Sequence, residues 1–427
     1  MPEINNGKSI WEQHNGKSRK SRNSINTMKI ERQIGVGSVR LTGRAKKYLR
    51  EVLNANRLSY GPFSRKFELA FGQAHGCSQA IFVNSGTSAL QLAVAALKEK
   101  YQWPDGDEII VPALTFVASS NVIIKNNLTP VFVDVHPRYY NLDPALLEKA
   151  ITSRTRAIMV VHLFGQPAEM DTIMTIAQQH NLRVIEDSCE TMFARYDGKS
   201  VGSFGDISCF STYACHIICT GVGGLATTND LELAVLLRSL ANHGRDAIYI
   251  SMDDDKTDDL HKLGMIMDRR FNFVRLGYSY RATEMEAALG LAQVEEIERN
   301  ISKRRRHARF LRQQLAPWKE HLQLPEIMPK AEHSFMMFPL VLTNQAISRH
   351  ELTLFLEQNN IETREMLPLT NQPYNQRLFG EDLEEKYPAA QFINERGFYI
   401  GCHPDLTKEE LHYVVEKFAE FFRQKGL

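Results

Sequence analysis

Short apolar runs alternate with longer stretches of helical period along roughly the first 300 residues. The helical period is clearest at residues 44–54, 64–74 and 90–101, and the apolar runs fall at residues 80–83, 108–111, 130–134, 157–162 and 182–187. Runs this short, bounded by polar residues and glycine, are typical of buried strands. Because strands that alternate with helices are joined by crossovers, the pattern predicts an α/β fold with a mostly parallel sheet between helices.

The pattern changes near residue 300. A charged helix is expected from Lys303 onward, followed by an apolar segment at residues 335–342 and a closing helix at residues 408–425. These elements predict a smaller C-terminal α+β domain. Residues 1–28 are polar and have no hydrophobic period, so we expect a disordered arm there. The predicted division is therefore an arm (1–28), a large domain (29–298) and a small domain (299–427).

Composition excludes several classes of protein. Lys and Arg total 51 against 50 for Asp and Glu, so no broad electrostatic field attracts nucleic acid or an anionic membrane surface. No apolar run approaches the roughly 20 residues that span a bilayer, and no signal peptide is recognisable, so we expect a cytoplasmic protein. Six cysteines are too few for a dense disulfide pattern. The acidic run at residues 253–259 lacks the spacing of a calcium loop and is interpreted as solvated.

Candidate chemistry begins directly after the first predicted strand. Residues 84–89 (Asn-Ser-Gly-Thr-Ser-Ala) form a glycine turn that leads into a helix. Free backbone N–H groups at such a helix start favour an anion, and a plain capped helix is the equally weighted alternative. Ligands of parallel sheets bind beyond the carboxyl ends of the strands. We therefore expect one pocket to collect Asn84, Thr115, Asp187 and His216.

Six segments, in this order, resemble the DegT/DnrJ/EryC1/StrS family of fold-type I pyridoxal-phosphate enzymes. They are residues 84–89, 111–118 (Val-Pro-Ala-Leu-Thr-Phe-Val-Ala), 162–167 (His-Leu-Phe-Gly-Gln-Pro), 185–190 (Ile-Glu-Asp-Ser-Cys-Glu), 211–224 and 277–293. The resemblance runs from about Val36 to the C-terminus. It implies a fold like that of aspartate aminotransferase and substrates that are nucleotide-linked keto sugars.

The resemblance also implies roles for individual residues. Asp187 would pair with the pyridine nitrogen of the cofactor, which lets the ring accept electrons, although a helix N-cap is the alternative for this residue. Phe116 would stack on the ring, although a phenylalanine after a strand is more often part of the core. The cofactor phosphate would be held by Gly86, Thr87 and Ser211.

Further residues are assigned by the same resemblance. Glu190 would lie beside the phenolic oxygen of the cofactor. Ser279 and Arg281 belong to a segment that family members supply from the neighbouring subunit, which implies a homodimer. Arg281, His333 and Arg364 are the expected substrate contacts.

Three positions depart from the family pattern. Glu190 replaces the usual glutamine, Val222 replaces an acidic residue, and Ser279 replaces asparagine. A carboxylate at Glu190 is hard to rationalise unless it is protonated or paired. We have no explanation for Val222.

The fourth departure is His216, which stands where the family has the lysine that holds the cofactor covalently. Imidazole cannot form that bond, so the resemblance implies non-covalent binding of pyridoxal 5'-phosphate or pyridoxamine 5'-phosphate. Histidine still moves protons, with an ordinary pKa of roughly 6.5. The same replacement marks the GDP-4-keto-6-deoxymannose 3-dehydratase-like members. We therefore expect a nucleotide-sugar 3-dehydratase with His216 as base and glutamate as amino donor.

Other functions remain open. The chain is alternatively a sugar aminotransferase of the same family that uses His216 or another lysine, although Lys199 reads as a surface residue of a hairpin. A third possibility is a regulatory protein that binds the cofactor and turns nothing over. Some family dehydratases carry an iron-sulfur cluster, and Cys189 matches its first ligand. Ala247 and Tyr249 stand where two more are expected, so we predict no metal. No motif identifies the sugar or the nucleotide.

Overall fold

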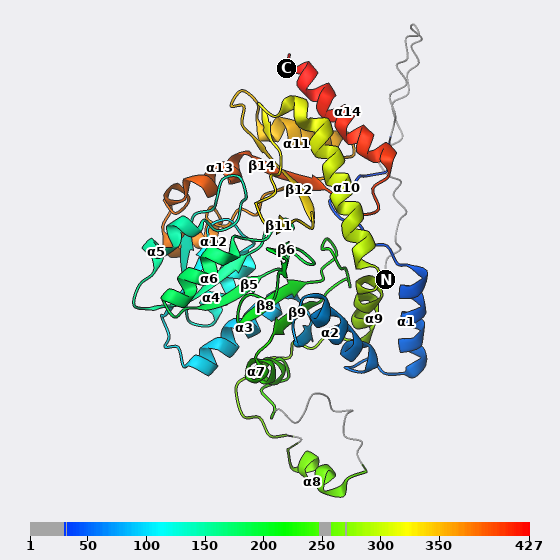
Figure 1. The fold of residues 1–427 in the computed structure, drawn as a ribbon, viewed down its shortest axis with the longest axis vertical. Coiled ribbons are helices and arrows are strands. Elements are labelled where there is room, and N and C mark those ends of the chain that lie inside the picture. Colours follow the sequence, from blue (N-terminus) through cyan, green and yellow to red (C-terminus); the bar gives the residue numbers. More distant parts are fainter. Residues whose placement is uncertain (1–29, 31, 247–257, 270) are drawn as a thin grey trace, which may run out of the picture.

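The computed structural model describes residues 30, 32–246, 258–269 and 271–427. The predicted arm at residues 1–28 lies outside the described residues, as does most of the acidic run at residues 253–259. Figure 1 shows a lower body built around one sheet and a smaller upper body that the long helix α10 (Ile297–Leu315) joins to it. Among the described residues, none of the helices combines the length and apolar character that a bilayer crossing requires.

The central sheet has seven strands in the order β1-β9-β8-β5-β4-β2-β3. Their bounds are β1 (Gln79–Val83), β2 (Glu108–Pro112), β3 (Thr129–Val133), β4 (Thr155–Val161), β5 (Arg183–Asp187), β8 (Ile207–Ser211) and β9 (Gly224–Thr228). Strands β3, β2, β4, β5 and β8 pair in parallel, and only β9 pairs antiparallel, with both β8 and β1. The prediction of a mostly parallel sheet is therefore confirmed.

Helices surround this sheet because its strands are apolar on both faces. The helices of this part are α1 (Gly43–Ala55), α2 (Pro62–Ala74), α3 (Gly86–Tyr101), α4 (Val117–Lys125), α5 (Leu147–Ala150), α6 (Met170–Gln179), α7 (Leu231–Ala241), α8 (Leu260–Arg269) and α9 (Glu284–Val294). All residues of β2, β8 and β9 are buried, as expected for a sheet covered on both sides. Figure 1 shows α8 standing apart from the sheet below α7.

One predicted boundary in this region is wrong. The helix expected from residue 90 begins at Gly86, because the Ser85 hydroxyl accepts a hydrogen bond from the Ser88 N–H and caps it there. The glycine turn is thus the first turn of α3 itself. The backbone N–H groups of that turn point out of the helix at the end of β1, which places the predicted anion site on the helix start.

The C-terminal part contains a four-stranded antiparallel sheet in the order β10-β12-β14-β13. Its elements are β10 (Leu322–Gln323), β12 (Met337–Leu342), β13 (Thr363–Glu365), β14 (Gly397–Gly401), α11 (Arg349–Gln358), α12 (Pro373–Phe379), α13 (Pro388–Arg396) and α14 (Lys408–Gln424). A third, short sheet of β11 (Ala331–Glu332), β6 (Arg195–Tyr196) and β7 (Lys199–Ser200) ties the two parts together. The α+β character of this region is as predicted.

The proposed domain boundary after residue 298 falls in the first turn of α10, and this helix begins six residues before the predicted Lys303. Ile34, from the N-terminal side, belongs to the apolar core of the C-terminal part and forms a bridge to Ile361. Residues 34–38 therefore run back along the small domain before the chain enters α1. The division into a large and a small domain stays a proposal.

Candidate active site

A chain of hydrogen bonds joins the ends of two strands at the carboxyl edge of the sheet. Thr115, in the loop after β2, lies 2.9 Å from the Ser119 hydroxyl, and that hydroxyl donates to the Asp187 carboxylate over 2.7 Å. Asp187 is the last residue of β5 and is 4% exposed. The parallel pairing of strands thus brings together groups 72 positions apart in the sequence, from Thr115 to Asp187.

Asp187 is held in place from its own loop as well. Its Oδ1 accepts a hydrogen bond of 3.2 Å from the Cys189 N–H. Burial raises the pKa of this carboxyl group above its ordinary value, and the hydrogen bonds from Ser119 and Cys189 oppose that rise. No helix follows Asp187 in the described loop at residues 188–194, so the alternative of a helix N-cap is wrong.

Gly86 is closely packed against Ser211 and Cys189, and we call this place at the start of α3 the cradle. A Cβ atom built on Gly86 would lie 2.7 Å from the Cβ of Ser211 and 2.8 Å from the Sγ of Cys189, closer than packed atoms approach. Ser211 is the last residue of β8 and is buried, whereas Thr87 is exposed on the first turn of α3. The helix start and the two hydroxyl groups bring hydrogen-bond donors of the kind that favours an anion to one place. Their role in holding a phosphate stays a prediction.

Glu190 is a half-buried acid near this cradle. Its carboxylate accepts a hydrogen bond of 3.2 Å from the Phe164 N–H. Burial, together with the neighbouring Asp187, raises the pKa of Glu190 to about 7. A raised pKa makes the protonated form of this carboxyl group more accessible near neutral pH, the condition under which the sequence allows a carboxylate here.

Phe116 occupies the N-cap position of α4 and is 57% exposed. The expectation that a phenylalanine after a strand belongs to the core is therefore wrong at this position. An exposed aromatic ring at the carboxyl edge of the sheet is available to stack on a flat ligand.

His216 lies on the loop between β8 and β9, half-buried. Its Nδ1 is 3.4 Å from the Sδ of Met336, and the ring of Tyr213 packs edge-on with centroids 6.5 Å apart. Burial and the charge of Arg304 lower the pKa of this imidazole to about 4. His216 is thus neutral over the physiological range and able to accept a proton.

The other predicted contacts lie in separate places. Ser279 and Arg281 are exposed, and the Arg281 guanidinium lies 3.1 Å from the Ser279 hydroxyl and 3.2 Å from the His243 ring. Their segment runs beside β1, where Tyr280 O accepts the Asn84 N–H over 2.8 Å. The pair therefore faces outward beside the strand that leads into the glycine turn.

Arg364 and His333 belong to the small domain and its border. Arg364 is exposed on β13, pairs with Glu362, and stands opposite Tyr399 of β14. His333 is 3% exposed and stacks on the Phe335 ring at 3.8 Å, and burial lowers its pKa to about 3. No described hydrogen bond or ring contact joins His333 to Asp187 or His216, so its role in substrate binding stays a prediction.

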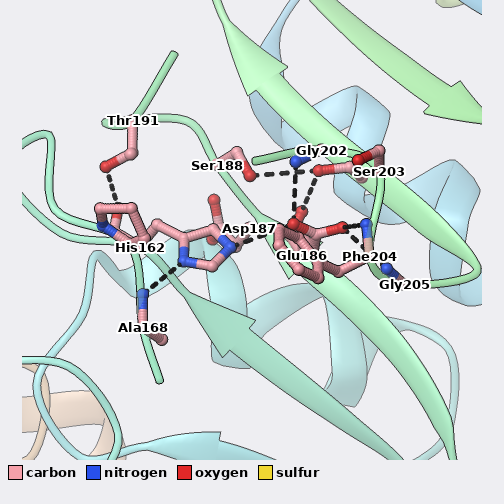
Figure 2. Close-up of polar contacts among 12 residues, drawn as sticks. His162, Ala168, Glu186, Asp187, Ser188, Thr191, Gly202, Ser203, Phe204 and Gly205 are labelled. Atoms are coloured by element: carbon pink, nitrogen blue, oxygen red, sulfur yellow. Dashed lines mark hydrogen bonds and ion pairs between the residues drawn. The ribbon is translucent and has the colours of Figure 1, made fainter. Parts of the chain in front are cut away.

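A second polar network supports the site from within the sheet. Glu186, the neighbour of Asp187 on β5, is fully buried and receives the His162 Nε2–H over 3.2 Å and the N–H groups of Gly202, Phe204 and Gly205 over 2.8 Å each (Figure 2). Burial alone favours the neutral acid, but these donors outweigh it and lower the pKa of Glu186.

The ring of His162 is fixed at both nitrogens. Its Nδ1 accepts the Ala168 N–H over 2.9 Å, so the proton resides on Nε2 and points at Glu186. The same residue's backbone N–H donates to Asp187 O over 3.0 Å. The network therefore fixes the end of β5 on which Asp187 is carried.

Sequence reasoning missed Ser119 and Met336. Ser119 follows Thr115 by four residues at a helix start, a spacing that places both hydroxyl groups on one side, so a signal existed. Met336 lies 120 positions from His216, and no local pattern predicts that contact. Among the described residues, no group of three or more His, Cys, Asp and Glu is placed to hold a metal ion.

The chain is similar to known proteins over most of its length. A model of the DegT/DnrJ/EryC1/StrS aminotransferase family matches residues 40–419. The chain is 36% identical to GDP-perosamine synthase of Caulobacter vibrioides (90% of this chain and 96% of that protein). It is 35% identical to dTDP-4-dehydro-2,6-dideoxy-D-glucose 3-dehydratase of Saccharopolyspora spinosa, over 86% of this chain and 81% of that protein.

A solved structure is similar over most of its length. It is GDP-4-keto-6-deoxy-D-mannose-3-dehydratase of Escherichia coli with bound hydrated PLP, at a TM-score of 0.81 and 27% identity over 90% of this chain and 98% of that chain. The fold, the matched residues and the shared length lead to one conclusion. This chain belongs to the DegT/DnrJ/EryC1/StrS aminotransferase family.

Proposed function

We propose that this protein is a nucleotide-sugar 3-dehydratase that binds pyridoxal or pyridoxamine phosphate without a covalent bond and uses His216 as its base. The observation that supports the proposal is a half-buried imidazole with a lowered pKa on the loop after β8, at the position that the resemblance assigns to the family's lysine. Lys199 does not replace that lysine, because it is exposed on β7 with its Nζ 4.5 Å from the Phe204 ring.

The carboxyl edge of the sheet fits the cofactor. Gly86, Thr87 and Ser211 would hold the phosphate, because a side chain at Gly86 would fill the cradle. Asp187 would face the pyridine nitrogen, and Phe116 would stack on the ring. When bound, the cofactor supplies an amine that condenses with the sugar ketone and a ring that accepts electrons.

The protein's own groups would then manage protons and charge. Neutral His216 would take the proton whose removal leads to loss of the C3 hydroxyl, and would return a proton where one is needed. Asp187 would keep the pyridine nitrogen protonated. Glu190, with a pKa of about 7, would share a proton with an oxygen of the cofactor rather than repel it. Glutamate would restore the amine form after each turnover.

Substrate and assembly are inferred from the relatives. The dehydratase and perosamine synthase relatives are named for GDP- and dTDP-linked sugars, so a nucleotide-linked 4-keto-6-deoxy sugar is the proposed substrate. Arg281, His333 and Arg364 are its proposed contacts. We further propose a homodimer, in which the outward-facing Ser279 and Arg281 of one subunit complete the site of the other.

The test separates elimination from transamination. The purified protein would be incubated with pyridoxamine phosphate, glutamate and GDP-4-keto-6-deoxymannose or its dTDP-linked counterpart, and the sugar analysed by mass spectrometry. Loss of the C3 oxygen with no gain of nitrogen is the expected result, and it should vanish in His216→Asn. A product in which an amine replaces the ketone oxygen and the C3 hydroxyl is kept would overturn the proposal.

Two alternatives have their own readouts. An aminotransferase, favoured by the perosamine synthase relative, would give the amino sugar and would bind pyridoxal phosphate through a lysine, which borohydride would fix to the chain. A regulatory protein would retain the cofactor and change neither sugar. The variant His216→Lys should acquire the borohydride-fixed cofactor and lose elimination, which makes it the matched control.

A further inference from the structure

A buried arginine without an acidic partner lies close to the proposed base. Arg304, on α10, is 3% exposed. Its Nη1 donates to the backbone carbonyls of Phe335 over 3.2 Å and of Met336 over 2.8 Å, and its Nε has no hydrogen-bond partner. The described residues offer it no ion pair, whereas Arg238, also largely buried, is 3.1 Å from Glu68.

Arg304 and His216 meet at the same residue. The carbonyl of Met336 accepts from Arg304, while the Sδ of Met336 lies 3.4 Å from the Nδ1 of His216. Met336 is anchored in turn by its N–H, which donates to Phe164 O over 3.0 Å. The backbone that carries the Met336 side chain is therefore held by the guanidinium group on one side and by Phe164 on the other.

The charge of Arg304 acts on the imidazole, and the described residues form no ion pair that would neutralise it. Asp405 does act on Arg304, but its carboxylate is engaged by the Ser38 hydroxyl at 2.8 Å and by Arg40 at 3.5 Å. Burial is the first cause of the lowered pKa of His216, and the charge of Arg304 is the second. Arg304 itself has its pKa lowered by burial to about 10, so it stays charged at neutral pH.

The other titratable groups around Arg304 have pKa values that keep them uncharged near neutral pH. Cys402, at the end of β14, donates its thiol to Arg304 O over 3.5 Å, and burial raises its pKa to about 12. Burial lowers the pKa of His403 to about 4, and burial also lowers that of His307, whose Nδ1 lies 3.1 Å from His403 O. The loop that carries His216 also faces the charges of Glu362 and Arg364, which form an ion pair and act on the pKa of Cys215 with opposite signs. At His216 itself, Arg304 is the charge that contributes to the lowered pKa.

We propose that Arg304 is a positioning residue for the elimination reaction: its buried guanidinium orients Met336 against His216 and holds the imidazole in its neutral, proton-accepting form. The proposal rests on the function proposed for His216. A purely structural role needs only a donor for two carbonyl groups, and a neutral amide would serve. A buried charge without a counterion costs free energy. Its effect on the protonation of His216 is a role that a neutral amide could not perform.

The test reads the histidine directly, in the full chain without cofactor or substrate. The pH dependence of deuterium exchange at the C2–H of each histidine ring, measured peptide by peptide by mass spectrometry, gives a midpoint for each imidazole. Three forms would be compared: the native protein, Arg304→Gln, which keeps a donor and loses the charge, and Arg304→Lys, which keeps the charge.

In the native protein the midpoint of His216 is expected near 4. In Arg304→Gln it should rise by about one pH unit, the lower end of the range for removal of a nearby like charge, while Arg304→Lys leaves it low. His75 is the internal control, since it is fully buried, has its pKa lowered by burial to about 4 and has no contribution from Arg304 among its causes. An unchanged His216 midpoint in Arg304→Gln would overturn the proposal.

A fold defect would be recognised because the His75 midpoint would move as well. In that case the native protein still decides the matter, since a His216 midpoint at or above the ordinary value of roughly 6.5 would refute the proposed neutral form. If the dehydratase assay also succeeds, the acid limb of its pH profile should move to higher pH in Arg304→Gln. If the dehydratase assay fails while the His216 midpoint shifts in Arg304→Gln, the proposed elimination reaction is rejected, but the effect of the Arg304 charge on His216 is supported.

Discussion

The Ser119 hydroxyl donates a 2.7 Å hydrogen bond to the Asp187 carboxylate, and it does so from the first turns of α4 to the last residue of β5. The Ser119 oxygen is in turn 2.9 Å from the Thr115 hydroxyl. A carboxylate this deeply buried depends on such donors to stay ionised. The contact therefore links the packing of a helix on the sheet to the chemistry of the proposed cofactor site.

Ser119→Ala should weaken the binding of pyridoxamine phosphate by about tenfold or more. Hydrogen bonds to a charged group contribute roughly 1.5–3 kcal/mol, and without this one Asp187 would take up a proton more readily and pair less well with the pyridine nitrogen. Fluorescence titration of the cofactor measures the effect. Ser120→Ala is the matched control, because the Ser120 hydroxyl contacts Val117 O and Tyr374 instead. Equal affinities for the two variants would contradict the proposed role of Ser119.

Gly86→Ala should lower stability by about 1–3 kcal/mol, the usual cost of overpacking, and should abolish phosphate binding. The added methyl group would lie 2.7 Å from Ser211 Cβ and 2.8 Å from Cys189 Sγ. Gly43→Ala is the control, since Gly43 also begins a helix and a Cβ there meets nothing within 4 Å. Urea unfolding and cofactor titration of both variants test the prediction, and a stable Gly86→Ala that binds phosphate would refute the cradle.

Glu190→Gln should stabilise the protein at alkaline pH and leave it nearly unchanged in acid. The pKa of Glu190 in the folded chain is about 7, above its ordinary value of 4.5, so the folded state binds more protons than the unfolded state between these values. Its contribution to stability is then fully present below pH 4.5 and lost as pH rises through 7. Glutamine does not titrate, so the difference in melting temperature should grow from about pH 5 to about pH 8.

The control for this measurement is Glu381→Gln, which alters an exposed carboxylate of the small domain. It should show no difference that depends on pH in this way. A constant offset between Glu190→Gln and the native protein across the range would mean that Glu190 is ionised in the folded chain.

His162→Ala should cost about 3 kcal/mol or more in the free energy of unfolding. It removes one partner of a pair that is entirely buried, and Glu186 would keep only its backbone donors. Urea denaturation followed by circular dichroism measures the loss, and His261→Ala, at an exposed position on α8, should cost nothing. Equal stability of the two variants would show that the network in Figure 2 does not support β5.

The periodic pattern determined most of the large part of the fold. The seven strands of the central sheet include all five predicted apolar runs, because runs that are apolar on both faces have few ways to be buried. The missed start of α3 has a local cause, because the Ser85 hydroxyl caps the helix so that it begins at Gly86. From sequence alone a glycine indicates a turn, since its hydrogen bonds are not known. The early start of α10 likewise follows from packing of Ile297 and Ile301 against the core rather than from the charged run.

Within the site, the sequence alone determined which side chains stand at the carboxyl ends of strands, because chain order and strand direction place Asp187 and Ser211 at the same edge. It also carries His216, which the resemblance places where the family has its lysine. Only the tertiary structure decided the ionisation of these groups. A pKa depends on burial and on charges that arrive from other elements: Arg304 from α10 beside His216, and the walls that exclude water from Glu190. Those distances are set by packing, which local sequence patterns do not contain.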